Sequence, residues 1–402
     1  MKKTKSFCST NTPLNQPTIP YGRQSIDESD IMAVTDVLRS DFLTTGPKVK
    51  EFEEALSKYI DVKYAISVSN GTAALHLASL AILNKGDMVI TTPNSFVATS
   101  NAILYAGGNP VFVDIKDDGN IDLDKVTELL EKDNSIKALY VVHFSGNPVE
   151  MEKLRYIKEH FGIKILEDAA HGLGATYNGK KIGHLEYSDI ATFSFHPVKH
   201  ITTGEGGAIT TNSQDIYEKV ITLRNHSIIR SNFTNVEQAF DEKGNPNPWY
   251  YEMVNLGFNY RLTDFQAALG ISQLKKLDLF LQKRNGLAKR YDEYFKNTII
   301  KPLYRFNENS AYHLYVVRID FDRLHITKAE LFNKMKEKGI FLQVHYIPIP
   351  MQPYYRDLGY GADNLPSTLK YYKEAISLPI YPDLTFEMQE YVVKSLFEIV
   401  GV

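Results

Sequence analysis

One lysine stands between two stretches of very different character. Lys199 follows an apolar and aromatic run over Ile190–Phe195 and precedes a turn that contains Gly204, Gly206 and Gly207. The apolar run is typical of a buried strand, and the glycines indicate backbone that bends sharply or passes close to another group. A lysine that is partly shielded from water at such a position loses its proton near neutral pH and becomes an amine nucleophile. We therefore expect a reactive amine rather than the solvated charge that most lysines carry.

A second polar cluster follows an earlier apolar run. Residues 165–171 read Ile-Leu-Glu-Asp-Ala-Ala-His, an apolar run that ends in acids and is followed by small residues. This pattern is typical of a strand that feeds a loop at its C-terminal end, and open parallel sheets bind their ligands outside those ends. We expect Asp168 and His171 to lie near the reactive lysine.

A third candidate is the turn between a short strand and a helix. Residues 64–69 predict a strand, and Asn70-Gly71-Thr72 leads into a helix expected over 73–83. A helix N-terminus exposes unpaired N–H groups and the positive end of the helix dipole, which together bind anions. Many strand–helix turns contain Asn-Gly, so the turn alone is a weak signal. No Gly-Lys-Ser/Thr follows it, so it is not the phosphate loop of nucleoside triphosphatases.

Apolar runs of strand length alternate with amphipathic stretches of helical period through the first two thirds of the chain. The expected strands are 87–93, 110–114, 138–143, 164–168, 190–195 and 208–211. The expected helices are 26–38, 49–59, 97–106, 123–130, 151–160, a helix through 226, and one from 267 through 297. This alternation predicts an α/β fold with a mostly parallel sheet and helices on both faces.

The pattern changes in the last third. Strands at 315–319 and 341–345 alternate with helices at 328–338 and 367–376, which indicates a smaller α+β domain. We expect a polar N-terminal arm over 1–20, a large domain over 21–280 and a small C-terminal domain over 281–402.

Residues 227–256 have little periodicity and many turn formers. A segment of this length without structure of its own is uncommon in a compact domain, so we expect a functional loop or a subunit contact.

Composition narrows the class of protein. The 402 residues carry a formal net charge of −3, which gives no indication of binding to nucleic acid or to an anionic membrane. The single cysteine, Cys8, excludes a disulfide framework and a cysteine-rich metal site. No apolar segment follows the N-terminal lysines, and no run approaches 18 apolar residues, so we expect a cytoplasmic protein. His196 and His200 have the spacing of a metal pair, but Pro197 argues against a helix there and no acidic motif accompanies them, so no metal is expected.

Three motifs together resemble the pyridoxal-phosphate-dependent sugar aminotransferases of the DegT/DnrJ/StrS family. They are Glu-Asp-Ala-Ala-His over 167–171, Ser-Phe-His-Pro-Val-Lys over 194–199 and Gly-Glu-Gly-Gly over 204–207, and the resemblance extends over nearly the whole chain. It implies the fold type I architecture of pyridoxal 5′-phosphate (PLP) transferases and PLP as cofactor, with pyridoxamine 5′-phosphate as its aminated form. One departure is Ser227, because the family often has Arg-Asn-His-Gly where this chain has Arg-Asn-His-Ser over 224–227.

The resemblance implies two catalytic residues. Lys199 would be the amine that holds PLP, and it would then carry the proton between the amino donor and the cofactor. Asp168 would face the ring nitrogen and keep it protonated. Some relatives have histidine in place of the lysine and dehydrate sugars, so the lysine here favours transamination.

The same resemblance implies further cofactor contacts within one subunit. Thr72 and Ala73 would bind the phosphate at the helix N-terminus, and Ser194 would reach it from the strand. Phe96 would stack on the pyridine ring, although most phenylalanines are simply core residues. His171 would contact the phenolic oxygen of the ring.

Asn259 resembles an asparagine that reaches the phosphate from a neighbouring subunit, which implies a homodimer with shared active sites. Candidate substrate contacts are His196, Glu205, Arg230, His345 and Tyr346.

Segments 19–24, 117–122 and 343–346 most resemble the pseudaminic-acid branch of the family. That branch implies transfer of the amino group of L-glutamate to the C4 ketone of a UDP-linked 4-keto-6-deoxy-N-acetyl-hexosamine. Another nucleotide-linked keto sugar, of the perosamine, bacillosamine or aminoarabinose type, is the alternative substrate. A PLP-binding regulatory protein is disfavoured because the chain has no DNA-binding segment or basic stripe. A nicotinamide-dependent enzyme is disfavoured because no Gly-x-Gly-x-x-Gly follows the first strand.

Overall fold

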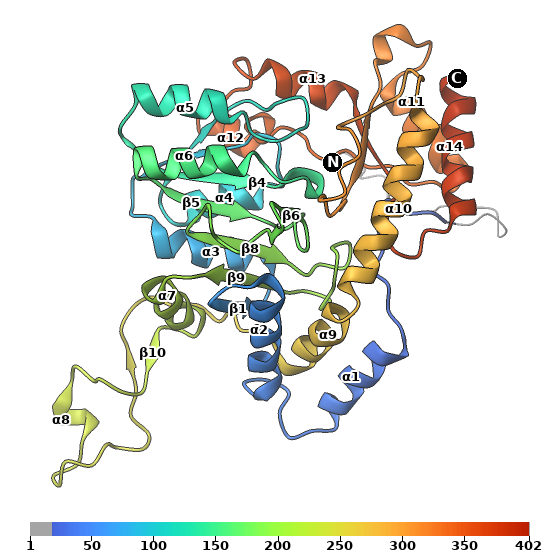
Figure 1. Ribbon diagram of the computed structural model, residues 1–402. Helices are drawn as coiled ribbons and strands as arrows, with labels where there is room; N and C mark the ends of the chain where they lie inside the picture. The colour runs from blue at the N-terminus through green and yellow to red at the C-terminus, as the bar shows by residue number, and fades with distance from the viewer. Residues whose placement is uncertain (1–17, 402) are drawn as a thin grey trace, which may run out of the picture.

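The computed structural model describes residues 18–401, and its centre is a seven-stranded sheet (Figure 1). The strand order is β1 (Tyr64–Val68), β9 (Gly207–Thr211), β8 (Ile190–Ser194), β5 (Lys164–Asp168), β4 (Ile136–Val142), β2 (Met88–Thr91) and β3 (Asn109–Phe112). The pairs β8–β5, β5–β4, β4–β2 and β2–β3 are parallel, and β9 pairs antiparallel with both β1 and β8. The predicted mostly parallel sheet is confirmed.

Both faces of the sheet are covered, which explains why its strands are almost continuously apolar. In β4, Leu139 and Val141 pack into one core, whereas Ala138 and Tyr140 pack into the core on the opposite face. Helices on the first face are α2 (Pro47–Ile60), α5 (Leu123–Lys132) and α6 (Met151–Phe161). Helices on the second are α3 (Gly71–Ile82), α4 (Ala98–Tyr105) and α7 (Gln214–Arg224).

The chain joins its two lobes through α10 (Leu277–Phe295), which Figure 1 shows running from α9 toward α14. The prediction of one helix through 297 is wrong, because α9 (Asp264–Leu274) ends before α10 begins and a turn at 275–276 separates them. The two ends of α10 pack in different cores. Leu277 packs in the large core, whereas Leu287 and Tyr291 pack in the core of the second lobe. The predicted boundary at 280/281 lies inside α10 and stays a prediction.

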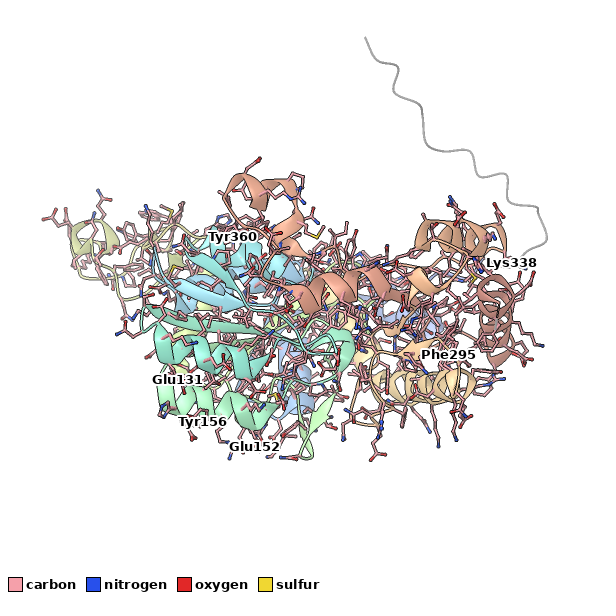
Figure 2. All side chains as sticks on the ribbon, turned by 90° about the horizontal axis from the view of Figure 1, so that it is seen from above. Glu131, Glu152, Tyr156, Phe295, Lys338 and Tyr360 are labelled. Atoms are coloured by element: carbon pink, nitrogen blue, oxygen red, sulfur yellow. The ribbon has the colours of Figure 1, made fainter. Side chains whose placement is uncertain are left out.

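The second lobe contains a three-stranded antiparallel sheet, β12 (Lys301–Pro302), β13 (Tyr315–Arg318) and β14 (Ala375–Leu378). The helices of this part of the chain are α11 (Lys328–Glu337), α12 (Pro353–Asp357), α13 (Pro366–Glu374) and α14 (Phe386–Val400), with short 3-10 turns η2 (Phe321–Arg323) and η3 (Ile349–Met351). In Figure 2, Phe295 and Lys338 lie on this lobe, away from Glu131 and Tyr156.

Two predictions in this lobe are wrong. Residues 341–345 form no strand, and only Gln343 makes a single bridge, to Ser377. The helix expected over 367–376 ends at Glu374, because the following Ala-Ile-Ser-Leu is entirely buried and pairs with β13 as β14.

The N-terminal arm expected over 1–20, including Cys8, lies almost wholly outside the described residues. Ile19 is fully buried, and the 18–20 segment lies against the second lobe through Ile19 N to Gly339 O at 2.9 Å and Phe341 N to Ile19 O at 2.9 Å. The next helix, α1 (Glu28–Leu38), begins with Asp27 as its N-cap.

Residues 228–253 project from the large lobe as a narrow arm, which Figure 1 shows at the lower left. The arm consists of β10 (Ile228–Ile229), α8 (Val236–Ala239) and β11 (Glu252–Met253), with β10 and β11 paired.

The remaining elements of the described chain are a small hairpin, β6 (Thr176–Tyr177) and β7 (Lys180–Lys181), and the 3-10 turn η1 (Phe144–Gly146). No helix among residues 18–401 is both long and apolar enough to cross a membrane.

Candidate active site

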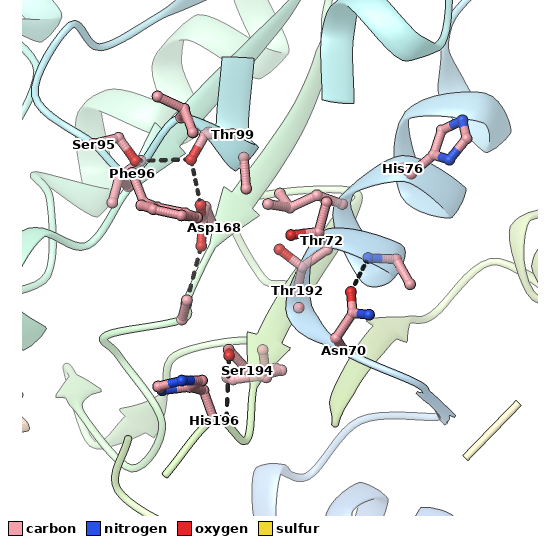
Figure 3. Close-up of a pocket in the computed structure, with 18 of the residues that line it drawn as sticks. Asn70, Thr72, His76, Ser95, Phe96, Thr99, Asp168, Thr192, Ser194 and His196 are labelled. Carbon is pink, nitrogen blue, oxygen red and sulfur yellow. Dashed lines mark hydrogen bonds between the residues drawn. The ribbon is translucent and has the colours of Figure 1, made fainter. Parts of the chain in front are cut away.

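Asp168 is the last residue of β5, at the edge of the sheet where the parallel strands end. Its carboxylate is almost fully buried, and both oxygens accept hydrogen bonds. Thr99 Oγ1 donates to Oδ2 at 2.6 Å and the Ala170 amide donates to Oδ1 at 3.1 Å. Ser95 Oγ lies 2.7 Å from Thr99 Oγ1, so Ser95 donates to the threonine that donates to the acid (Figure 3). The carboxylate is therefore fixed in orientation.

Burial raises the pKa of Asp168, and the hydrogen bonds from Thr99 and from the Ala170 amide oppose that rise. A buried carboxylate with this environment gains most from a cationic partner, because a positive charge in contact favours its ionised form. The site thus suits a protonated ring nitrogen.

Lys199 lies in the loop after β8, where its amide donates to the carbonyl of His196 at 2.8 Å. Lys199 lines the same cavity as Asp168, and its Nζ lies 3.3 Å from His313 Nε2. Burial lowers the pKa of Lys199 to about 8, with the charge of Arg284 lowering it further and that of Asp168 opposing. About a tenth of the Lys199 side chains are then free amines at pH 7, far more than for an ordinary lysine.

The N-terminus of α3 forms the third side of the site (Figure 3). Asn70 caps the helix, and its Oδ1 accepts from the Ala73 amide at 2.8 Å. Within residues 18–401 the amides of Gly71 and Thr72 donate to no other group, so they remain for an anion. A side chain at position 71 does not fit, because its Cβ would lie 2.9 Å from the Cβ of Ser194. The glycine thus lets the strand bring the Ser194 hydroxyl to the helix end.

His171 and Tyr346 line the same cavity. Tyr346 Oη lies 3.1 Å from His171 Nε2. Burial raises the pKa of Tyr346 well above its usual range and lowers that of His171 well below it, so at neutral pH the phenol donates to a neutral imidazole. The proton of this imidazole then sits on Nδ1, which is buried and has no partner among the described residues. A donor of this kind suits the phenolic oxygen of a bound ring.

These groups surround one cavity of about 1460 Å³. Eleven of the predicted residues line it, namely Thr72, Ala73, Phe96, Asp168, His171, Ser194, His196, Lys199, Glu205, His345 and Tyr346. Phe96 is 58% exposed, which leaves its ring face free to stack on a planar group.

Two predicted residues stand apart from this chain's own cavity. Arg230 and Asn259 are exposed and do not line it. Asn259 pairs with Asn225 in an isolated bridge, and the guanidinium of Arg230 lies 5.8 Å from the ring centre of Tyr251 in the projecting arm.

Sequence reasoning missed three residues that the structure adds to the site. Thr99 has no motif of its own, because it sits inside an ordinary helix and meets Asp168 only in three dimensions. His313 lies 114 positions after Lys199, in a stretch with no motif assigned. Tyr21 lines the cavity with its ring centre 5.2 Å from that of His345, and its only signal was its place in the 19–24 segment.

The residues present fit PLP. An anion cradle at α3, an acid for the ring nitrogen, a donor for the phenolic oxygen and a lysine with a lowered pKa all face one cavity. Among the described residues, no group of three histidine, cysteine or acidic side chains is arranged to hold a metal ion. His200, one of the two histidines with metal-pair spacing, lies buried with Nε2 3.1 Å from the carbonyl of Ala311.

The chain is similar to known aminotransferases over nearly its whole length. The chain is 40% identical over 384 residues to the UDP-4-amino-4,6-dideoxy-N-acetyl-beta-L-altrosamine transaminase of Campylobacter jejuni subsp. jejuni serotype O:23/36, covering 95% of this chain and 97% of that one. Helicobacter pylori PseC, an aminotransferase involved in the biosynthesis of pseudoaminic acid, superposes with a TM-score of 0.88 at 33% identity, covering 96% of this chain and 100% of PseC.

A sugar aminotransferase of Streptococcus pneumoniae, Spr1654, is similar to this chain in structures of both its PLP and its PMP forms. The TM-score is 0.84 in each case, at 29% and 28% identity, covering 96% of this chain and 99% and 98% of the other. The family model of the DegT/DnrJ/EryC1/StrS aminotransferases matches residues 24–397. The predicted fold, enzyme class and cofactor are confirmed: the chain belongs to this family and is a PLP-dependent sugar aminotransferase of fold type I.

Proposed function

We propose that the protein transfers the amino group of L-glutamate to the C4 ketone of a UDP-linked 4-keto-6-deoxy-N-acetyl-hexosamine, as in pseudaminic acid biosynthesis. The observation that carries the proposal is the size of the cavity at the Lys199 amine. At about 1460 Å³ it exceeds the roughly 300–1,000 Å³ of most ligand pockets, which leaves space for a nucleotide-linked sugar beside the cofactor. The altrosamine transaminases among the relatives support this substrate class.

Lys199 and Asp168 divide the chemical work in this proposal. PLP supplies the electron sink that makes the proton next to the transferred nitrogen acidic. The Lys199 amine, with a pKa near 8, holds the cofactor, and once released it carries that proton between the two carbon atoms that exchange it. Asp168 keeps the ring nitrogen cationic, and Thr99 holds the carboxylate in place for that contact.

The remaining cofactor residues fix the position of the ring and the phosphate. Thr72 and Ser194 bind the phosphate from α3 and β8, while the Ala73 amide is already engaged by the Asn70 cap. His171 donates from Nδ1 to the phenolic oxygen, and Phe96 covers one face of the ring.

Two subunits build each site in this proposal. Asn259 lies outside the cavity of its own chain, which agrees with a role in the site of a neighbouring copy. The projecting arm over 228–253 carries exposed apolar side chains, among them Trp249 at 74% and Met253 at 64% exposure. Burying them on a second copy would stabilise a homodimer. Arg230, at the base of the arm, would then meet the substrate in the neighbouring site.

The sugar nucleotide occupies the part of the cavity toward the second lobe. His345 and Tyr346 line the cavity from the segment after α11, and Glu205 and His196 line it from either side of Lys199 in the sequence. The other nucleotide-linked keto sugars remain the alternative, because they carry the same reacting ketone and differ in the other groups on the sugar and in the nucleotide.

The test is a panel of UDP- and GDP-linked 4-keto-6-deoxy sugars incubated with the PLP-loaded protein and L-glutamate. Mass spectrometry detects replacement of the ketone by an amine, and NMR assigns the configuration at C4. The proposal expects amination of the UDP-linked N-acetyl sugar at the highest kcat/KM. Amination of another nucleotide-linked keto sugar at a higher kcat/KM would replace the proposal by the alternative, and no amination of any sugar in the panel would overturn the proposed substrate class.

A further inference from the structure

A buried histidine outside the cavity contacts the lysine that holds the cofactor. His313 Nε2 lies 3.3 Å from Lys199 Nζ, and the histidine is 4% exposed. It does not line the cavity, so it stands behind the amine and cannot reach a substrate directly. Its one hydrogen-bonding contact with a residue of the proposed chemistry is the Lys199 amine.

The backbone that carries His313 is locked against the large lobe. The Ala311 amide donates to Gly146 O at 3.0 Å, and the Leu314 amide donates to Ser145 O at 3.3 Å. Between them Tyr312 has a φ of +42°, a value that non-glycine residues rarely adopt. Such a conformation persists only where surrounding contacts impose it, and it concentrates at functional sites.

A buried arginine completes this lock. Arg284 Nη1 donates to the carbonyls of Tyr312 at 3.2 Å and His313 at 3.3 Å. A Cβ at Gly146 would lie 2.8 Å from the Tyr312 amide nitrogen, so the two loops are in direct backbone contact. The imidazole of His313 is consequently held at a fixed place relative to the lysine.

The electrostatic surroundings of His313 and Lys199 decide which of the two side chains donates the hydrogen bond between them. The charged or titratable groups around the His313–Lys199 pair are Asp168, His171, His200, Arg284 and His345. The ring centres of His171 and His200 lie 4.3 and 5.5 Å from that of His313. Burial, with the nearby positive charges, lowers the pKa of His313 well below its usual value, so the ring is neutral. A neutral ring has one accepting nitrogen. Lys199, with a pKa of about 8, is mostly an ammonium at neutral pH, and an ammonium only donates. Nε2 of His313 is therefore the acceptor, and its proton lies on Nδ1, which is buried without a partner among the described residues.

We propose that His313 is the positioning residue of Lys199: its Nε2 accepts one N–H of the amine and so turns the nitrogen lone pair toward the cavity. This inference rests on the proposed role of Lys199 as the amine that holds the cofactor. The same hydrogen bond is stronger to the ammonium than to the amine, because a charged donor strengthens it. His313 therefore also limits how far burial lowers the pKa of the lysine.

The test is competitive labelling of the cofactor-free protein with acetic anhydride over a pH series of about 6–10, read lysine by lysine by peptide mass spectrometry. His313→Phe removes the acceptor and retains a ring, whereas His313→Gln retains an acceptor. We expect the midpoint of Lys199 labelling to fall by about one pH unit in His313→Phe, the loss of one charge-assisted hydrogen bond. The plateau rate above the midpoint falls about tenfold because the lone pair is no longer oriented. His313→Gln restores most of both values.

Lys328 is an internal control for folding in every sample. Its pKa is also lowered by burial to about 8, but it lies on α11 and donates to the carbonyl of Tyr372. Its labelling midpoint stays unchanged in both variants. An unchanged midpoint and plateau for Lys199 in His313→Phe would overturn the inference, and so would equal losses in the Phe and Gln variants.

A separate measurement keeps failure of the inference distinct from failure of the proposed function. Borohydride reduction of the PLP-loaded wild-type protein fixes the bond between cofactor and lysine, and mass spectrometry then locates that lysine. Cofactor on Lys199 supports the role on which the inference depends. Cofactor on another lysine would overturn that role, and with it the meaning assigned to the contact with His313.

Discussion

Replacing Asp168 by asparagine removes one charge and leaves the packing of the site unchanged. The amide oxygen can accept from the Ala170 amide, which now donates to Oδ1 at 3.1 Å. The amide nitrogen can donate to Thr99 Oγ1, provided that Thr99 then donates to Ser95 across their 2.7 Å contact. Because hydroxyl groups rotate to suit their partners, this reversal costs little. Asp168→Asn is thus a deletion of charge without a deletion of shape.

The expected loss follows from the ion pair that the carboxylate would form with the protonated ring of PLP. Removing one partner of a buried ion pair costs about 3–5 kcal/mol. If the whole cost falls on the transition state, the glutamate half-reaction slows by roughly 150- to 5,000-fold at about 1.36 kcal/mol per tenfold. The cofactor remains bound through its phosphate and the lysine, so the loss appears in the rate rather than in the amount of bound PLP.

Asp168→Asn lowers the rate of the loaded enzyme, but it should not lower the stability of the cofactor-free protein. Burial raises the folded-state pKa of Asp168 above the ordinary 3.8, so folding favours the protonated acid. The stability that this group contributes is complete below pH 3.8 and is lost as the pH rises through the raised pKa. The cofactor-free Asp168→Asn protein should therefore be at least as stable as wild type at neutral pH, and the difference should vanish in acid.

Two measurements check these expectations. Stopped-flow absorbance follows the loss of the visible cofactor band after mixing with L-glutamate, and urea unfolding follows the stability of the cofactor-free proteins across pH. A half-reaction in Asp168→Asn within tenfold of wild type would refute the assigned role of the carboxylate. A cofactor-free variant less stable than wild type at neutral pH would refute the pKa argument.

Four further predictions follow from single contacts. Gly71→Ala places a Cβ 2.9 Å from that of Ser194 and should weaken PLP binding about tenfold or more in a fluorescence titration, so an unchanged affinity would contradict the phosphate cradle. Ser227→Gly should raise the free energy of unfolding by about 1 kcal/mol in urea, since the buried serine holds a φ of +54°, and a less stable variant would speak against strain. Tyr346→Phe removes the donor to the neighbouring histidine and should lower kcat about tenfold at constant fold, whereas full activity would show that this hydrogen bond is dispensable. The rate of PLP uptake by the cofactor-free protein should rise about tenfold per pH unit up to about 8, where Lys199 becomes a free amine, and then level off; a profile that rises to pH 10 would contradict the lowered pKa.

The central sheet could be predicted because each strand is a short apolar run separated by helical periodicity. Segments whose structure depends on a distant partner could not. Residues 375–378 continue a helical pattern locally, yet they are drawn into a strand by pairing with β13. Residues 341–345 have the composition of a strand, but they pair only through Gln343 and then turn so that His345 and Tyr346 line the cavity.

The residues of the candidate site likewise fall into those that the sequence could predict and those that it could not. Lys199, Asp168 and the turn before α3 belong to contiguous motifs, so their chemistry could be inferred from neighbouring residues. Thr99 and His313 have no such context, because each meets its partner only after strands and loops far apart in sequence come together. The exposed Asn259 could be assigned to a shared site only by resemblance, since its partner would lie on another chain.

The central claim is tested most directly by one spectral titration of the purified protein with PLP. L-Glutamate should abolish the visible band of the bound cofactor, and a UDP-linked 4-keto-6-deoxy-N-acetyl-hexosamine should then restore it, whereas the same sugar without its ketone should not. Lys199→Ala should show neither change. A band that does not respond to L-glutamate, or that no nucleotide-linked keto sugar restores, would contradict the assignment of this chain as the aminotransferase for that substrate.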